Sequence, residues 1–289
     1  MIPNTNSVDT EIYGNPVEDV DYSELTLAND FMFSKVMQDK ELCCELLRRV
    51  LPELQIKKVE DVVPQKYMKH YFYNKGVRLD AYVRDDRGRR YDVEMQMTTN
   101  QDIPKRSRYY ASMMDANELL KGADYDTLSD SYVVFICTFD RFHKGLHKYT
   151  FRNICEENHS VHLKDGTTKI FLNTKGTADD VSPELLSFLN YLENNLAIAD
   201  DTYLKALDRA VRNARMNEEW RGEYMTYKDI KRGSYLHGFS EGKAEGKAEG
   251  RADAETRLNE IMQNMVNAGT ISGDVAEEIK AGLHSEEKK

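Results

Sequence analysis

The segment "GVRLDAYVRDDRGRRYDVEMQM", residues 76–97, contains two short runs in which apolar and polar residues alternate, separated by a charged turn at 85–88. Alternation with a period of two on both sides of a turn predicts the two antiparallel strands of a hairpin, each with one face toward a core. Gly88 tolerates a positive φ, which suits a three-residue loop that ends in a left-handed glycine. Such a loop fixes how the two strands pair.

Two acids oppose each other in this pairing. Counting back from the turn places Asp80 opposite Glu94, and Gln96 lies on the same face, turned away from the core. Directly opposed residues have Cβ atoms roughly 4.5–5.5 Å apart, and like charges at that distance destabilise a sheet. Two explanations remain open: arginines of this face could neutralise the acids, or a divalent cation such as Mg²⁺ could lie between them. The arginines are Arg78, Arg84 and Arg90.

The composition narrows the classes of function. The 289 residues carry a formal net charge of -10, so contact with nucleic acid would need a local basic surface. The longest apolar run, 132–137, is far shorter than the ~20 residues of a membrane span, and the N-terminus has no signal-peptide pattern. The four cysteines form no C-x-x-C pair, which indicates reduced thiols and no zinc site. We expect a soluble cytoplasmic protein.

The chain divides by composition into four parts. Residues 1–24 carry six acids and neither Lys nor Arg, which predicts a flexible lead. Residues 25–176 contain the helix and strand signals of one α/β domain. Residues 177–236 predict helices, beginning at a Ser-Pro pair, and 237–289 form a Gly/Glu/Lys-rich repeat with a C-terminal helical tail.

Helix and strand signals alternate within the α/β domain. Asn29 or Asp30 can cap a first helix, and Asp39 can cap a second helix that Pro52 stops. The predicted strands are 56–68, the two strands of the hairpin described above, 129–140 covered on both faces, and a second hairpin over 160–174 around Asp165-Gly166. This order predicts an α/β sandwich around a mixed sheet.

A helix follows the first hairpin and begins with basic residues. Asp102 can cap it, Pro104 suits its first turn, and Gly122 can end it. Cations at a helix N-terminus oppose the macrodipole, which is mildly unfavourable unless an anion joins them. Both an ordinary solvated surface and a phosphate-binding surface fit the three cations of this turn, which are Lys105, Arg106 and Arg108.

Several of these pieces occur together in a known family. The order of a helix with "NDFMFSKVM" (29–37), then "RLDAYV" (78–83), "YDVEMQ" (91–96) and a helix that begins "PKRSRYY" (104–110) resembles the PD-(D/E)XK nuclease superfamily. It is most similar to the Rpn branch, labelled recombination-promoting nucleases or PD-(D/E)XK nuclease family transposases. The resemblance implies a restriction-endonuclease-like α/β core, in which helices flank a mixed central sheet, with a helical C-terminal region.

The resemblance also implies roles for individual residues. Asp80 and Glu94 correspond to the acids that bind Mg²⁺, and Gln96 corresponds to the third motif residue, which helps to position the attacking water. Gln96 stands where the superfamily usually has a lysine, and an amide takes no proton at neutral pH. Base chemistry would then fall to a water whose pKa the metal ion lowers. Arg106 and Tyr110, one helical turn apart, are candidates for holding the scissile phosphate.

Two further acids are weaker candidates. Glu45 lies on a helix and is explained well as a solvated residue. Asp92 shares the face of the two motif acids, and we expect it to pair with Arg84 or Arg90.

The resemblance implies a Mg²⁺-dependent endonuclease that hydrolyses DNA phosphodiester bonds, in recombination or in defence against foreign DNA. The alternative is a catalytically silent nuclease fold that acts as an oligomerising interaction or regulatory module. A DDE-type transposase fits less well, because such enzymes usually draw their acids from strands far apart in sequence. Asp80 and Glu94 instead belong to one hairpin.

The glycine repeat of the tail predicts a homo-oligomer. Glycines recur at intervals of four, which on a helix would let two helices approach closely, although a charged linker also fits the pattern. They are Gly238, Gly242, Gly246 and Gly250. We expect truncation after Gly233 to lower the oligomeric mass measured by light scattering, and an unchanged mass would contradict this expectation.

Overall fold

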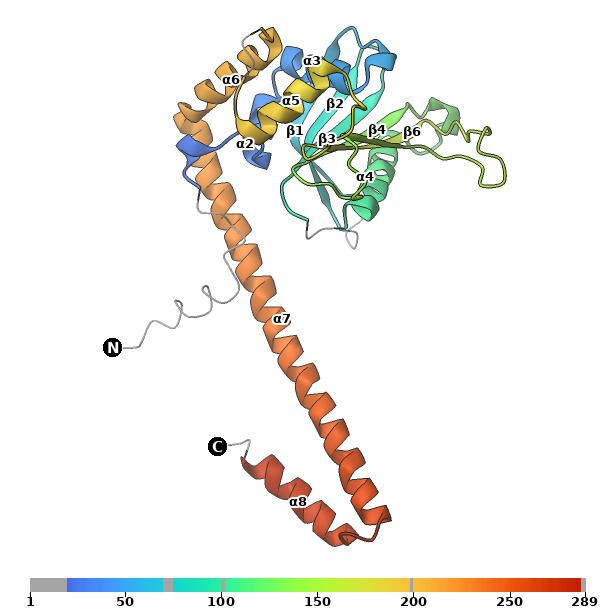
Figure 1. Ribbon diagram of the computed structural model, residues 1–289, viewed down its shortest axis with the longest axis vertical. Helices are drawn as coiled ribbons and strands as arrows, with labels where there is room; N and C mark the ends of the chain where they lie inside the picture. The colour runs from blue at the N-terminus through green and yellow to red at the C-terminus, as the bar shows by residue number, and fades with distance from the viewer. Residues whose placement is uncertain (1–19, 70–74, 100–101, 198–199, 287–289) are drawn as a thin grey trace. The chain divides into compact units, whose positions relative to one another are not determined.

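The fold is built around a six-stranded sheet with the strand order β1-β2-β3-β4-β6-β5 (Figure 1). The computed structural model describes residues 20–69, 75–99, 102–197 and 200–286. The strands are β1 (Val59–Met68), β2 (Val77–Asp85), β3 (Arg90–Gln96), β4 (Ser131–Cys137), β5 (Lys148–Phe151) and β6 (Thr167–Asn173). β4 runs parallel to β3 and β6, and the other pairs are antiparallel. The prediction of a mixed sheet is confirmed.

The hairpin of β2 and β3 has the predicted register. Ala81 pairs with Val93 and Val83 with Tyr91. The N–H of Gly88 donates to the Asp85 carbonyl at 3.1 Å, and Gly88 has a φ of 78°. The left-handed glycine therefore closes the loop that sets the pairing.

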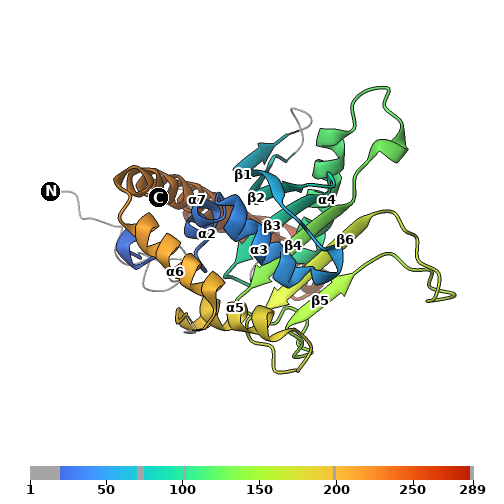
Figure 2. The same ribbon diagram turned by 90° about the horizontal axis from the view of Figure 1, so that it is seen from above.

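Helices cover both faces of the sheet. α4 (Ile103–Glu118) lies on one side, and α2 (Asp30–Val36), α3 (Lys40–Val50) and α5 (Pro183–Asn194) lie on the other, as Figure 2 shows. Every residue of β3 is buried. The expectation that one face of the hairpin is turned away from the core is therefore wrong for β3, because α4 packs on that face. In β2 the predicted alternation is confirmed, with Arg78 and Arg84 exposed.

The predicted helix starts are confirmed by their caps. The side chain of Asn29 accepts from the N–H groups of Phe31 and Met32, and those of Asp39, Asp102 and Ser182 cap α3, α4 and α5 in the same way. α4 ends at Glu118, one turn before the predicted stop at Gly122. Capping residues in the sequence therefore predict where these helices begin more accurately than where they end.

The hairpin predicted over 160–174 is wrong. β6 pairs with β5, which lies earlier in the chain, and the described part of 160–166 contributes one isolated bridge between His162 and Ile154. β5 places the buried Tyr149 opposite Phe171. Val161 and Leu163 are instead exposed, so a strand at 160–164 would bring no buried side chain to this edge.

The two outer strands of the sheet differ in length and composition. β1 pairs with β2 alone among the described strands. It contains Pro64, which has no N–H to donate, and Gln65, whose φ of 46° is left-handed. β5, at the opposite edge, has four residues.

The chain forms two units, of which the larger is Asp19–Tyr224. It includes α6 (Thr202–Arg215), which contacts α2 and α3, so the predicted boundary after residue 176 lies inside this unit. Residues 1–19 of the predicted lead lie outside the described residues. Residues 22–24 form a 3₁₀ helix, η1 (Tyr22–Glu24), in which Tyr22 is buried and its hydroxyl donates to the Ala214 carbonyl.

The glycine repeat is helical. It lies within α7 (Glu218–Asn267), and α8 (Gly273–Glu286) follows. Of the two structures that fitted the repeat, a helix and a linker, the helix is the one observed. Among the helices of the described residues, none is long and apolar enough to cross a membrane.

A partly buried ion pair joins α3 to α6. Arg49 donates through Nη1 to Asp201 Oδ2 at 2.7 Å and through Nη2 to Oδ1 at 2.8 Å. Burial acts to raise the pKa of Asp201, but the hydrogen bond from Arg49 and its charge outweigh burial and hold that pKa below its ordinary value. Asp201 Oδ1 also caps α6 by accepting from the N–H groups of Tyr203 and Leu204.

We expect Asp201→Asn to lower the free energy of unfolding by about 2 kcal/mol at neutral pH, because hydrogen bonds between charged groups contribute roughly 1.5–3 kcal/mol. Asparagine still caps a helix, so the substitution removes the ion pair alone. The folded-state pKa is depressed, so this contribution is complete above the unfolded pKa of about 3.9 and is lost as pH falls through the folded value. Urea unfolding at neutral pH and at about pH 3 measures the effect. Equal differences at both pH values would contradict the assignment.

Candidate active site

Asp80 and Glu94 lie side by side where the ladder between β2 and β3 ends. The last regular pair is Ala81 with Val93. Beyond it, the Asp80 N–H donates to Glu94 Oε1 at 2.9 Å, and the Met95 N–H donates to Asp80 Oδ2 at 3.1 Å. Each carboxylate is thus held by the backbone of the opposite strand, in the place that a carbonyl would take in a continued ladder.

A third carboxyl, that of Asp92, lies beside this pair. Asp92 is fully buried, and no N–H or hydroxyl group of the described residues donates to its oxygens. It hydrogen-bonds with the carboxyl of Glu94, which requires one of the two groups to carry a proton. The expected pairing with Arg84 or Arg90 is wrong. Arg90 is buried and instead forms ion pairs with two acids of α4, Asp115 and Glu118.

The three carboxyl groups raise one another's pKa. Burial is the largest cause for each, and it raises the pKa values of Asp80, Asp92 and Glu94 well above their ordinary range. Repulsion adds to burial: the charge of Glu94 raises the pKa of Asp80, and that of Asp92 raises the pKa of Glu94. Without a cation the site therefore favours the protonated form of these groups, and a bound cation would favour the ionised form.

Arg106 of α4 supplies one positive charge to this cluster. Its Nη2 lies 3.2 Å from Glu94 Oε2, and its Nη1 donates to Gln96 Oε1 at 2.8 Å. Nε and Nη2 also donate to the Tyr110 hydroxyl, at 3.2 and 2.9 Å. The guanidinium carbon lies 5.2 Å and 5.3 Å from the ring centroids of Tyr110 and Phe135. α4 thus brings Arg106 and Tyr110 to the carboxylates.

The amide of Gln96 is engaged at both ends. Its Oε1 accepts from Arg106, and its Nε2 donates to the carbonyl and the hydroxyl of Thr98 at 2.9 and 3.2 Å. These contacts fix the orientation of the amide, with its oxygen toward the guanidinium. A lysine at this position would place a second cation against Arg106 and would offer it no acceptor.

The other two predicted cations lie on the outer surface of α4. Lys105 is 76% exposed at its side chain and pairs with Asp102, and Arg108 is exposed. Neither contacts Asp80 or Glu94 in the described structure. Glu45, the weaker candidate on α3, forms ion pairs with Arg48 and Arg49.

α2 also reaches Asp80, an approach that the sequence alone did not predict. The Ser34 hydroxyl donates to the Asp80 carbonyl at 2.8 Å, and the charge of Asp30 adds to those that raise the pKa of Asp80. Asn29 caps this helix, although the side chain of Asp30 also accepts from the Phe31 N–H. The adjacent residues Asn29 and Asp30 could have indicated this in the sequence. Only one of two neighbouring polar residues is needed to cap the helix, so the charge of the other can act on a nearby group.

The donor set suits a hard divalent cation. Mg²⁺ is held in proteins by one or two carboxylates and keeps several waters. Asp80 and Glu94 provide two adjacent carboxylates. The buried carboxyl of Asp92, to which no N–H or hydroxyl group of the described residues donates, lies next to them. Within the described residues no group of three or more His, Cys, Asp and Glu side chains has the geometry to hold a metal ion. The residues therefore fit a site made of two carboxylates and water.

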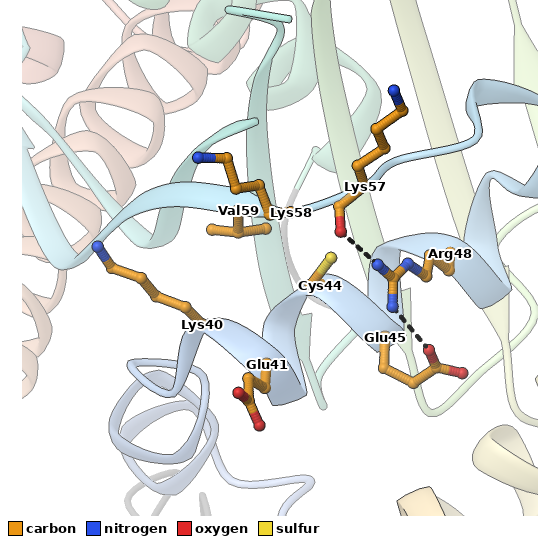
Figure 3. A pocket seen from close by; sticks show the side chains of 8 residues that line it. All are labelled: Lys40, Glu41, Cys44, Glu45, Arg48, Lys57, Lys58 and Val59. Carbon is orange, nitrogen blue, oxygen red and sulfur yellow. Dashed lines mark hydrogen bonds and ion pairs between the residues drawn. The ribbon is translucent and has the colours of Figure 1, made fainter. Parts of the chain in front are cut away.

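A separate concavity of about 430 Å³ lies between α3 and the start of β1 (Figure 3). Arg48 in its wall donates to the carbonyls of Ile56 and Lys57, and Lys40 donates to that of Glu60. Because Arg48 and Lys40 are already engaged, and Glu45 is the one candidate residue in the lining and pairs with arginines of its own helix, we assign this concavity no function. Its lining is Lys40, Glu41, Cys44, Glu45, Arg48, Lys57, Lys58 and Val59.

Comparison with protein families gives a match that covers most of this chain. The family is described as PD-(D/E)XK nuclease family transposase, and its model matches residues 27–229. Comparison with curated proteins and with solved structures gives no match. The matched span includes both strands of the hairpin, α4, and every candidate site residue described above. The chain therefore belongs to the PD-(D/E)XK nuclease family transposases.

Proposed function

We propose that the protein is a cytoplasmic, Mg²⁺-dependent endonuclease that hydrolyses DNA phosphodiester bonds. The observation that supports this most directly is the pair of carboxylates, Asp80 and Glu94, fixed side by side by backbone N–H groups with a guanidinium 3.2 Å from one of them. A metal ion and an arginine stabilise phosphoryl transfer by neutralising the negative charge that develops on the phosphate. The family supports a nuclease-like function.

Each residue of the site has a proposed role. Asp80 and Glu94 hold Mg²⁺, which when bound lowers the pKa of a coordinated water and neutralises charge on the phosphate. Arg106 binds a phosphate oxygen, because a guanidinium matches the geometry of a phosphate. Tyr110 orients Arg106, and burial raises its pKa, so the hydroxyl stays neutral at physiological pH. Gln96 holds the other edge of Arg106 and does not act as the base.

The word transposase in the family description does not determine the chemistry. Both acids belong to one β-hairpin, whereas DDE-type transposases usually draw their acids from strands far apart in sequence. We propose that cleavage serves recombination or defence against foreign DNA, in a homo-oligomer formed through the helical tail.

We expect the wild-type protein to nick or cut plasmid DNA with Mg²⁺ and to lose this activity in EDTA. Asp80→Ala and Glu94→Ala should each lower the rate by roughly a hundred-fold or more, because each removes a ligand of the metal ion that would neutralise charge on the reacting phosphate. Glu45→Ala removes an acid that pairs with Arg48 and Arg49 instead, and this control should retain activity. Circular dichroism checks that each variant is folded. Equal cutting by wild type and the Asp80 and Glu94 variants would refute the assignment.

The charges of the site also predict how Mg²⁺ changes stability with pH. Without a cation, burial and repulsion hold the pKa values of Asp80 and Glu94 above their unfolded values, so the folded protein binds more protons than the unfolded chain. Stability of the metal-free protein therefore falls as pH rises through these folded-state values. Because Mg²⁺ binds the ionised carboxylates, we expect the rise in melting temperature that it causes to grow between about pH 5 and about pH 8.

Differential scanning calorimetry with and without Mg²⁺ measures this effect. In Asp80→Asn the Mg²⁺-dependent rise should disappear, since one of the two ligands is gone. A rise of the same size in Asp80→Asn and wild type would show that the ion stabilises the protein from another place.

A further inference from the structure

Arg106 already occupies the carboxylate that a metal ion would use. Its Nη2 lies 3.2 Å from Glu94 Oε2, while Glu94 Oε1 accepts from the Asp80 N–H. Glu94 is 3% exposed at its side chain, so little water reaches it to replace either partner. A divalent cation that binds Glu94 is therefore repelled by the guanidinium and competes with it for the charge of the same carboxylate.

The cluster of carboxyl groups explains why the guanidinium lies there. Asp92 and Asp80 both lie beside Glu94, and no N–H or hydroxyl group of the described residues donates to Asp92. An uncompensated buried carboxylate is costly, and the charge of Arg106 reduces that cost. In the protein without a metal ion, Arg106 is thus a substitute for the missing cation.

Arg106 also has the freedom to reach a second anion. Its side chain is 25% exposed, whereas Glu94 is buried. The guanidinium of Arg106 also contacts neutral groups. Gln96 Oε1 and the Tyr110 hydroxyl both accept hydrogen bonds from it, and the Tyr110 and Phe135 rings lie against it. These contacts do not depend on the charge of Glu94, so they can keep the guanidinium in place while its anionic partner changes.

We propose that Arg106 exchanges Glu94 for a DNA phosphate, and that this exchange makes divalent-cation binding and phosphate binding favour each other. The inference rests on the proposed function and specifies how the site is regulated. A phosphate that takes the guanidinium frees Glu94 for the cation, and a cation on Glu94 frees the guanidinium for a phosphate. Linkage requires the two effects to be equal in size. Gln96 then acts as a positioning residue through Arg106.

The test measures cation affinity rather than cleavage. Mn²⁺ prefers the same oxygen ligands as Mg²⁺ and can be followed by its paramagnetic resonance signal. We expect Arg106→Met to bind Mn²⁺ about five-fold or more tightly than wild type without DNA, a factor typical of coupled sites. Arg108→Met removes the same charge from the exposed side of the same helix, and it should change Mn²⁺ affinity by less than about two-fold because exposed charges are well screened.

A second titration adds a short phosphorothioate duplex that resists cleavage. The duplex should tighten Mn²⁺ binding in wild type, and this gain should be smaller in Arg106→Met by the same factor of about five, since linkage is reciprocal. Equal changes in Mn²⁺ affinity in Arg106→Met and Arg108→Met would refute the exchange. So would a duplex that tightens Mn²⁺ binding by the same factor in wild type and in Arg106→Met.

Asp80→Asn separates this inference from the proposed function. If Asp80→Asn binds Mn²⁺ as wild type does, the cation site itself is wrong and the exchange fails with it. If Asp80→Asn loses Mn²⁺ binding but Arg106→Met gains none, the cation site stands and the exchange alone is overturned.

Discussion

Asp80 and Glu94 meet because a short loop holds β2 and β3 in one register. Side chains alternate between the faces of a strand, so a slip of one residue would move one of the two acids to the opposite side of the sheet. Gly88 prevents that slip by closing the loop in a left-handed conformation. The ladder then ends at Ala81 and Val93, and the carboxylates accept the next N–H groups. Only in this register does Arg106 of α4 lie beside a pair of adjacent carboxylates.

Burial makes this arrangement both costly and reactive. α4 covers Glu94, and burial raises the pKa values of Asp80 and Glu94 and strengthens their interactions with a cation. A site with three carboxyls and one nearby guanidinium is less stable than an apolar packing of the same volume. Proteins commonly retain such strain where function requires it, since the groups that destabilise the free protein are those that bind the ligand.

Local features could be predicted from the sequence, whereas tertiary cover could not. Alternation and one glycine were enough for the hairpin, and single polar residues such as Asn29 and Asp39 were enough for the helix starts. The alternation of apolar and polar residues shows which side chains of a strand are polar, but it does not show whether a helix packs on them. The burial of β3 under α4 was therefore not predicted. Asp92 was assigned to an arginine of its own hairpin, but Arg90 is held by acids of α4. The partner of β6 was missed because β5 has four residues and lies on the other side of a long loop.

The edge strand β1 bears on how the protein behaves at high concentration. An exposed edge offers free N–H and carbonyl groups to which a strand from another molecule can add, and this is a common start of aggregation. Pro64 lacks one of those donors, and the left-handed Gln65 bends the strand out of the extended shape that an incoming strand would match. Pro64 and Gln65 therefore disfavour the addition of a strand from another molecule to β1. Self-association is expected to use other surfaces of the protein.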